Sequence, residues 1–234
     1  MEGIICVTKK HRKMAAKEFL YCYKMTHDTG FAPNPYHGVL TLATCKPTIR
    51  RCAEVNYWIS GWTSNKVQGK SDESHFTDDT QELIYLAKVS KKIPIEDYWE
   101  NYPKKQQPTK SIEGGKKCFK SCGKSIVVKN DDISFCGDNI YEPDANDPSG
   151  FKQHKNAHHN EQNKAHDLSG KNVLVCEEFY YFGVENAIPK SDIINDKNFV
   201  VPRCKKNQLD DPIAKQIIDF VTKRYSSGIN KKKI

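Results

Sequence analysis

The residue types best suited to binding or catalysis are concentrated in residues 30–51 of this chain, which read GFAPNPYHGVLTLATCKPTIRR. Pro33 and Pro35 restrict the backbone and predict a rigid, non-helical loop. The apolar run 39–43 that follows predicts a buried strand, which leads into Cys45. A stiff loop beside a buried strand is how scaffolds present a polar site, although the pattern also fits a proline-braced turn with solvated arginines.

Three cations follow this strand, and they favour contact with phosphate groups. Lys46, Arg50 and Arg51 are candidates, because guanidinium groups match phosphate oxygens in two-pronged fashion. Aromatic faces beside cations are also suited to stacking on an unpaired base. The neighbouring aromatic residues are Tyr36, Tyr57, Trp58 and Trp62. A position in the core is the alternative for the tryptophans.

A second polar stretch holds Asp138, Asn139 and Tyr141, and we expect it to meet the first in space together with Asn34 and His37. An asparagine offers a donor and an acceptor to a base edge, and an aspartate accepts from an amino group. Asp138 with His37 is also suited to general acid–base catalysis. The alternative is a structural turn, because Gly-Asp-Asn is favourable turn chemistry.

Cys45 is a candidate nucleophile, with His37 or His75 as its base. The nearby Lys46 and Arg50 favour the thiolate form of a cysteine. A buried and inert cysteine is the alternative.

Zinc binding is not expected, because the cysteines and histidines do not have the spacing of a standard zinc finger. No phosphate-binding Walker loop, dinucleotide-binding fingerprint or zinc-deaminase signature is present. The sequence therefore does not identify a cofactor. These cysteines and histidines are Cys118, Cys122, Cys136, His154, His158, His159 and His166.

The chain has 234 residues and a net charge of +8, with a pI of about 8.9. This charge favours a polyanionic partner, DNA or a nucleotide first, and predicts salt-sensitive DNA binding through the lysines of residues 103–129. An AT-rich genome would produce a similar lysine content. Nine cysteines without a secreted-type framework, no signal peptide and no long apolar run predict a cytoplasmic protein with free thiols and no membrane contact.

The hydrophobic pattern predicts an α+β fold built on a curled mixed or antiparallel sheet, with flanking helices and a C-terminal helix. Residues 63–80 and 142–168 are expected to form loops, the second with at most a short helix. The expected strands are 19–25, 39–43, 58–62, 83–89, 125–129 paired with 133–135, 172–176 and 179–182. The expected helices are 94–101 and a last one that Asp211 caps and Pro212 begins.

Several blocks of this sequence resemble the nucleotide modification associated domain family in its second type. The blocks are GFAPNP at 30–35, Gly38, TLA at 41–43, CKP at 45–47, IRR at 49–51, GDNIY at 137–141 and FYYFG at 179–183. Where the family tends to have Gly-Asp-Trp after the arginines, this chain has Asn56-Tyr57-Trp58, which puts any role of that turn in doubt.

The resemblance implies a DNA base-modification setting, in phage–bacteria conflict and beside other base-modification proteins, without implying a reaction. It divides the chain into an N-terminal extension (1–17), the domain (18–200) and a C-terminal helix with a basic tail (201–234). By analogy, the middle of the chain also suggests a small barrel like those of base-reading modules related to pseudouridine synthase domains.

Two functions from different classes follow. In the first, the protein is a nucleic-acid- or nucleotide-binding module that recognises a modified base. In the second, it is an enzyme that makes or removes such a modification. An interaction subunit of a modification complex is a third option.

Overall fold

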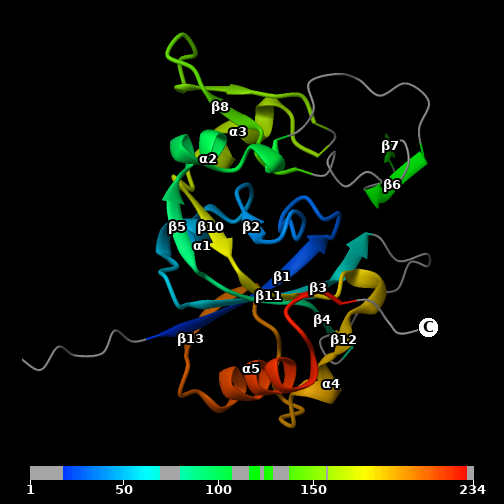
Figure 1. Ribbon diagram of the computed structural model, residues 1–234. Helices are drawn as coiled ribbons and strands as arrows, with labels where there is room; N and C mark the ends of the chain where they lie inside the picture. Colours follow the sequence, from blue (N-terminus) through cyan, green and yellow to red (C-terminus); the bar gives the residue numbers. More distant parts are fainter. Residues whose placement is uncertain are drawn as a thin grey trace, which may run out of the picture.

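The computed structural model describes residues 18–68, 80–106, 116–121, 124–128, 137–156 and 158–230 (Figure 1). Several predictions fall outside these ranges: the N-terminal extension, His75, Cys122, Cys136, the strand 133–135 and the basic tail.

The largest element of the fold is a mixed seven-stranded sheet with the order β13-β1-β3-β4-β11-β14, in which β12 also pairs with β4. Two pairs, β1 with β3 and β11 with β14, are parallel. The remaining pairs are antiparallel. The strands are β1 (Phe19–His27), β3 (Trp58–Gln68), β4 (Glu82–Lys88), β11 (Glu178–Tyr181), β12 (Ile188–Pro189), β13 (Cys204–Gln208) and β14 (Gly228–Ile229).

Strand β1 has a hydrophobic residue on each face, because successive side chains of a strand point to opposite sides. Tyr21 and Tyr23 join one buried cluster, which also contains residues of a smaller sheet. Leu20 and Cys22 join another, which contains residues of the C-terminal helix. The main sheet is therefore covered on both faces.

The smaller sheet has the order β2-β10-β5 and lies on one face of the main sheet (Figure 1). Its central strand also alternates: Leu174 and Cys176 pack toward the main sheet, whereas Val173 and Val175 pack toward α2 and β8. The strands are β2 (Leu40–Leu42), β5 (Lys91–Pro94) and β10 (Asn172–Cys176).

Short elements complete this side of the molecule, where α2, α3 and β8 lie beyond the smaller sheet (Figure 1). They are α1 (Pro47–Cys52), α2 (Ile95–Asn101), η1 (Pro103–Lys105), β8 (Tyr141–Pro143), β9 (Phe151–Gln153) and α3 (Glu161–Leu168). A separate hairpin is formed by β6 (Lys116–Ser121) and β7 (Lys124–Val128).

The opposite face of the main sheet is covered by α5 (Pro212–Arg224), with α4 (Lys190–Ile193) nearby (Figure 1). The short helix η3 (Val184–Asn186) follows β11 in the chain. Asp211 caps α5 by accepting the N–H groups of Ile213 and Ala214 at 2.8 and 3.2 Å. Pro212 takes the first position, where its missing N–H has no consequence. Ile217 and Val221 are fully buried against the sheet.

The α+β class with a mixed sheet is confirmed, but the sheets of the described residues do not close into a barrel. One further expectation needs correction: strand β3 continues to Gln68, into the segment expected to be a loop. Strand β7 pairs with the preceding β6, and its expected partner 133–135 lies outside the described residues. A short helix, α1, follows Cys45. None of the helices in the described ranges has the length and apolar character that a membrane span requires.

Candidate active site

Cys45 lies in the tight turn between β2 and α1. Cys45 and Lys46 both have left-handed backbone conformations, with φ values of 55° and 40°. These are unfavourable for residues with a Cβ atom and are concentrated at functional sites. Pro47 then begins α1. The chain thus holds a cysteine on a strained strand–turn–helix connection, which is also how many hydrolases present a nucleophile.

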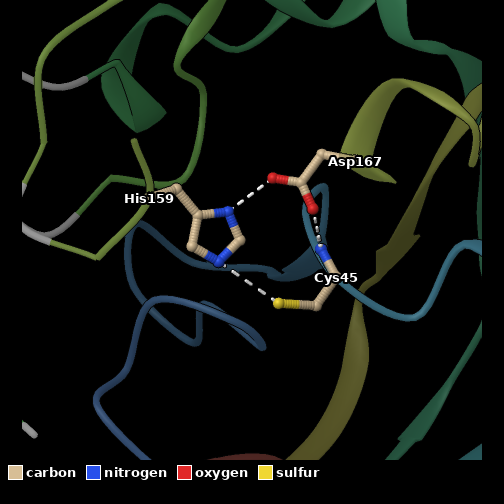
Figure 2. Close-up of side chains that lie close together, drawn as sticks. All are labelled: Cys45, His159 and Asp167. Atoms are coloured by element: carbon tan, nitrogen blue, oxygen red, sulfur yellow. Dashed lines mark hydrogen bonds and ion pairs between the residues drawn. The ribbon is translucent and has the colours of Figure 1, made fainter. Parts of the chain in front are cut away.

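His159 and Asp167 complete a cluster around the thiol (Figure 2). The Sγ of Cys45 lies 3.4 Å from Nε2 of His159. On the other side of the ring, Nδ1 of His159 lies 2.5 Å from Oδ2 of Asp167. The second oxygen of this carboxylate, Oδ1, accepts the backbone N–H of Cys45 at 2.7 Å. The three residues therefore form a closed ring of contacts.

The segment before α3 fixes the histidine. The side-chain oxygen of Asn156 accepts the backbone N–H groups of His158 and His159 at 2.9 and 2.7 Å. Phe31 stacks on His158 with 4.7 Å between ring centroids and meets the edge of His159 at 5.0 Å. Asn160 then starts α3 with a capping box. The loop 30–35 thus supports the site through Phe31.

Asp167 lies in the last turn of α3 and is fully buried. Besides Cys45 and His159, it binds the hydroxyl of Tyr141, which donates to Oδ2 at 2.8 Å. Three donors on one carboxylate hold it in a single orientation and favour its ionised form.

Arg50 holds the backbone on both sides of the site and is fully buried. Its guanidinium donates to the carbonyl groups of Cys45 and Ala43 at 2.8 and 2.7 Å. It also donates to the carbonyls of Asn172 and Asp167. We therefore assign Arg50 a positioning role in place of the predicted phosphate contact, because its donors face carbonyls inside the protein.

The electrostatics of the site favour an ion pair between His159 and Asp167. Burial opposes the charged imidazole, but hydrogen bonds with Asp167 and Cys45 outweigh it and raise the pKa of His159 to about 9. Burial likewise opposes the carboxylate, but the bonds from His159, Cys45 and Tyr141 lower the pKa of Asp167. The neighbouring His158 behaves differently: burial, then the charges of His159 and His27, lower its pKa to about 4.

This arrangement is suited to nucleophilic catalysis. A protonated imidazole beside sulfur stabilises the thiolate, which is the nucleophilic form of cysteine. Asp167 orients the ring, and Nε2 holds a proton next to the sulfur. Cys45 is partly exposed, as a residue that meets a substrate must be.

The same ligand atoms could hold a metal ion, since those of Cys45, His159 and Asp167 lie within 4.8 Å of one another. However, the imidazole lies between the other two groups and presents a different nitrogen to each (Figure 2). One ion can bind only one of these nitrogens. The geometry therefore favours a relay of hydrogen bonds over a coordination sphere.

The two predicted polar stretches do meet, but they form a second, enclosed cluster. Asp138 is buried and accepts hydrogen bonds from the hydroxyls of Thr41 at 2.8 Å and Tyr98 at 2.7 Å. Nζ of the buried Lys105 donates to Oδ1 of Asn34 at 2.8 Å. Asn139 donates to the carbonyls of the segment 98–102. These contacts support the fold, and burial disfavours the base-edge role expected of Asp138, Asn139 and Asn34.

The other predicted residues are dispersed. Trp58 is buried in the cluster on the α5 side of the main sheet, away from Cys45. Tyr36 is also buried, against Gly30. Arg51 is exposed and donates to the carbonyl of Ser169 at 2.6 Å. The histidine at Cys45 is His159, where His37 or His75 had been expected.

Comparison with known families agrees with the resemblance seen in the sequence. The model of nucleotide modification associated domain 2 matches residues 17–232. This chain belongs to that family. The match includes α5, which the sequence had suggested to be separate. Neither a search of curated proteins nor one of solved structures found a match.

His159 and Asp167 were missed as partners of Cys45 because they are far away in sequence. The contacts join residues 114 and 122 positions apart, and no local pattern specifies such pairs. One signal was present: Asn160 and Asn163 form a helix start. It would have placed His159 just before a helix and Asp167 on it.

Proposed function

We propose that this protein is a cysteine-dependent enzyme that makes or removes a modification on a nucleotide or nucleobase. The observation that carries the proposal is the cluster of Cys45, His159 and Asp167 on a strained turn. Membership of the nucleotide modification family supports the substrate class.

The first step would be attack by the Cys45 thiolate on an electrophilic carbon of the base or of a group attached to it. A carbon–sulfur bond forms, and the displaced electron pair moves to the leaving atom. That atom takes the proton from Nε2 of His159. An incoming water or acceptor then returns a proton to Nε2 and displaces the sulfur, which restores the enzyme.

Recognition of a modified base without turnover is the main alternative. It is less well supported, because several residues expected to contact the base or its phosphate are buried: Asn34, Tyr36, Arg50, Trp58, Asp138 and Asn139. The enzyme hypothesis instead uses a partly exposed nucleophile with an oriented partner.

Thiol reactivity provides a test that does not require the substrate. The protein is alkylated with iodoacetamide at about pH 7.5, and the modified cysteines are quantified by mass spectrometry. Cys52 and Cys204 are exposed and free, which makes them internal controls. We expect Cys45 to react at least tenfold faster than either control and the His159→Gln variant to lose this advantage. Equal rates at the three cysteines would refute an activated nucleophile.

Turnover is tested directly by incubating the protein with DNA and with nucleotide mixtures and measuring changes in nucleoside mass. A mass change should depend on Cys45 and disappear in the folded Cys45→Ser variant. A change that persists in this variant would assign the chemistry elsewhere, and binding of a modified base with no change in mass would favour the recognition module.

A further inference from the structure

A band of cations lies along β13, an edge strand of the main sheet. Lys206 belongs to this strand and Arg203 precedes it, whereas Lys205 points to the opposite face of the strand. All three are exposed. The band is separate from residues 103–129, where the sequence had placed DNA binding.

The band begins beside the candidate nucleophile. Lys46 directly follows Cys45, and its Nζ donates to the carbonyl of Lys24 at 3.4 Å. The backbone N–H of Lys24 in turn donates to the carbonyl of Arg203 at 3.4 Å. Lys46 and Arg203 therefore both contact Lys24, which connects the Cys45 turn to β13.

The charge of this band is not neutralised by the acidic residues that the structure describes. Within the described ranges, no carboxylate forms an ion pair with Lys46, Arg203, Lys205 or Lys206. Of the acidic residues near the band, Glu54 pairs with Lys92 at 2.7 Å and Asp211 caps α5. Glu18 and Asp210 flank the Lys206 end of β13, where the backbone N–H of Leu209 donates to the carbonyl of Glu18. A group of cations without counter-charge attracts an anionic partner.

Aromatic rings lie at the far end of the band. Nζ of Lys206 is 3.8 Å from the ring centroid of Phe19 and 4.8 Å from that of Tyr57. The two rings are themselves 5.2 Å apart, and both side chains are partly exposed. Aromatic faces next to cations can stack with unpaired bases.

The length of the band indicates a polymer. Strand β1 pairs Tyr23 with Cys204 and Phe19 with Gln208. Four residues of strand span about 13 Å, at roughly 3.3 Å per residue. Phosphates repeat along a nucleic-acid strand, at a rise of about 3.4 Å per nucleotide in a duplex. A strand can therefore place several phosphates along this length, whereas a mononucleotide carries its phosphate groups at one position.

We propose that a single strand of nucleic acid binds along β13, with phosphates on Lys46, Arg203 and Lys206 and a base stacked on Phe19 and Tyr57. This surface would deliver a nucleotide of the strand to Cys45. The role of the surface as a substrate site rests on the proposed function, whereas strand binding itself does not.

The test is fluorescence anisotropy with a labelled single-stranded DNA of about 15 nucleotides, at roughly 50–300 mM KCl. We expect the Arg203→Gln/Lys206→Gln variant to bind at least tenfold more weakly at the lowest salt. Its salt dependence should also be shallower, by about 0.7 in the log–log slope for each phosphate that the variant no longer neutralises. The matched control is Lys197→Gln/Lys215→Gln, which removes two exposed cations from the side of α4 and α5. This control should bind like the wild type.

A second variant separates stacking from charge. Tyr57→Leu should weaken binding severalfold while leaving the salt slope unchanged. Equal losses in the β13 variant and its control would overturn the proposal, as would binding of a mononucleotide as tight as that of the strand. Strand binding is measured in the Cys45→Ser protein as well, so failure of this proposal and failure of the catalytic one give different results.

Discussion

Two polar clusters meet at β2 and the turn after it, and they differ in access. The Asp138 cluster is closed, since Asp138, Lys105, Thr41 and Tyr98 are each at most 1% exposed. The Cys45 cluster has an equally buried carboxylate, Asp167, but ends in a cysteine that is partly exposed. Residue types alone pointed to the first cluster as much as to the second. Chemistry requires a nucleophile with a path to substrate, and of these two clusters the second provides one.

The largest expected effects come from two separate variants, one that removes the carboxylate of Asp138 and one that removes that of Asp167. Asp138→Ala leaves the buried hydroxyls of Thr41 and Tyr98, and the nearby buried Lys105, without this carboxyl group, and should cost about 3–5 kcal/mol in the free energy of unfolding. Where the variant remains folded, alkylation of Cys45 should stay within about twofold of the wild-type rate. Urea unfolding and alkylation rates provide the two measurements.

The partner variant is Asp167→Asn, which keeps the shape of the side chain but removes the charge that orients His159. It should slow Cys45 alkylation by about tenfold or more, as expected for a misoriented partner. Asp138→Asn serves as the matched control. If Asp138→Asn slowed alkylation as strongly as Asp167→Asn, the two clusters would be one functional unit.

The second prediction concerns pH and uses the ion pair of the open cluster. The pKa of His159 rises from 6.5 in the unfolded chain to about 9. Protonation of His159 therefore stabilises the folded state. This contribution to stability is fully present below pH 6.5 and is lost as pH rises through 9. At about 1.36 kcal/mol per pKa unit, the contribution is on the order of 3 kcal/mol.

Urea unfolding between about pH 6 and pH 10 measures this contribution. The wild type should lose stability relative to His159→Gln across that range. A constant difference between the two proteins would show that His159 is not charged in the fold. The rate of turnover at Cys45 should also decline above about pH 9, where Nε2 of His159 no longer carries the proton for the leaving atom.

Much of the scaffold could be predicted from local sequence signals. The alternating pattern of residues 19–25 specified β1, and Asp211 with Pro212 specified the start of α5. Pro94 likewise indicated where α2 begins. These elements depend on periodicity and caps, which are local properties.

The site could be predicted only in part. Cys45 was identified because its turn is dense in unusual residues, but its partner is set by tertiary contacts. The role of Arg50 was also hidden, because an arginine beside a cysteine has the same appearance in sequence whether it faces solvent or carbonyls. Burial, which decides between these roles, depends on how α1 packs under α3 and β10.

The third prediction concerns Gly170, which allows the Arg50 guanidinium to approach the end of α3. A Cβ atom at this position would lie 2.3 Å from Cζ of Arg50. Gly170→Ala should therefore displace the guanidinium and cost about 1–3 kcal/mol in stability, as overpacking does. The change should also slow Cys45 alkylation, because Arg50 connects the carbonyls of Cys45 and Asp167.

The control for Gly170→Ala is Gly150→Ala, which lies in the turn between β8 and β9. Gly150 has space around it, although its φ of 77° makes alanine costly. This variant should lose stability without a change in alkylation rate. Loss of stability at Gly170 with an unchanged rate would mean that Arg50 supports the fold alone.

The smallest expected effect is that of Tyr141→Phe, which removes one hydroxyl from the open cluster. The hydroxyl of Tyr141 shares Oδ2 of Asp167 with Nδ1 of His159. Its loss removes one hydrogen bond, which is worth about 1 kcal/mol, and leaves the carboxylate to His159 and the backbone of Cys45. We expect a stability loss of that size and a two- to fivefold change in the alkylation rate.

Tyr98→Phe is the matched control, since it removes the equivalent bond to Asp138 in the closed cluster. Both variants should lose similar stability, but only Tyr141→Phe should change the reactivity of Cys45. Tyr141 binds Asp167, whose carboxylate contacts the histidine beside the thiol, whereas Tyr98 binds Asp138, which does not.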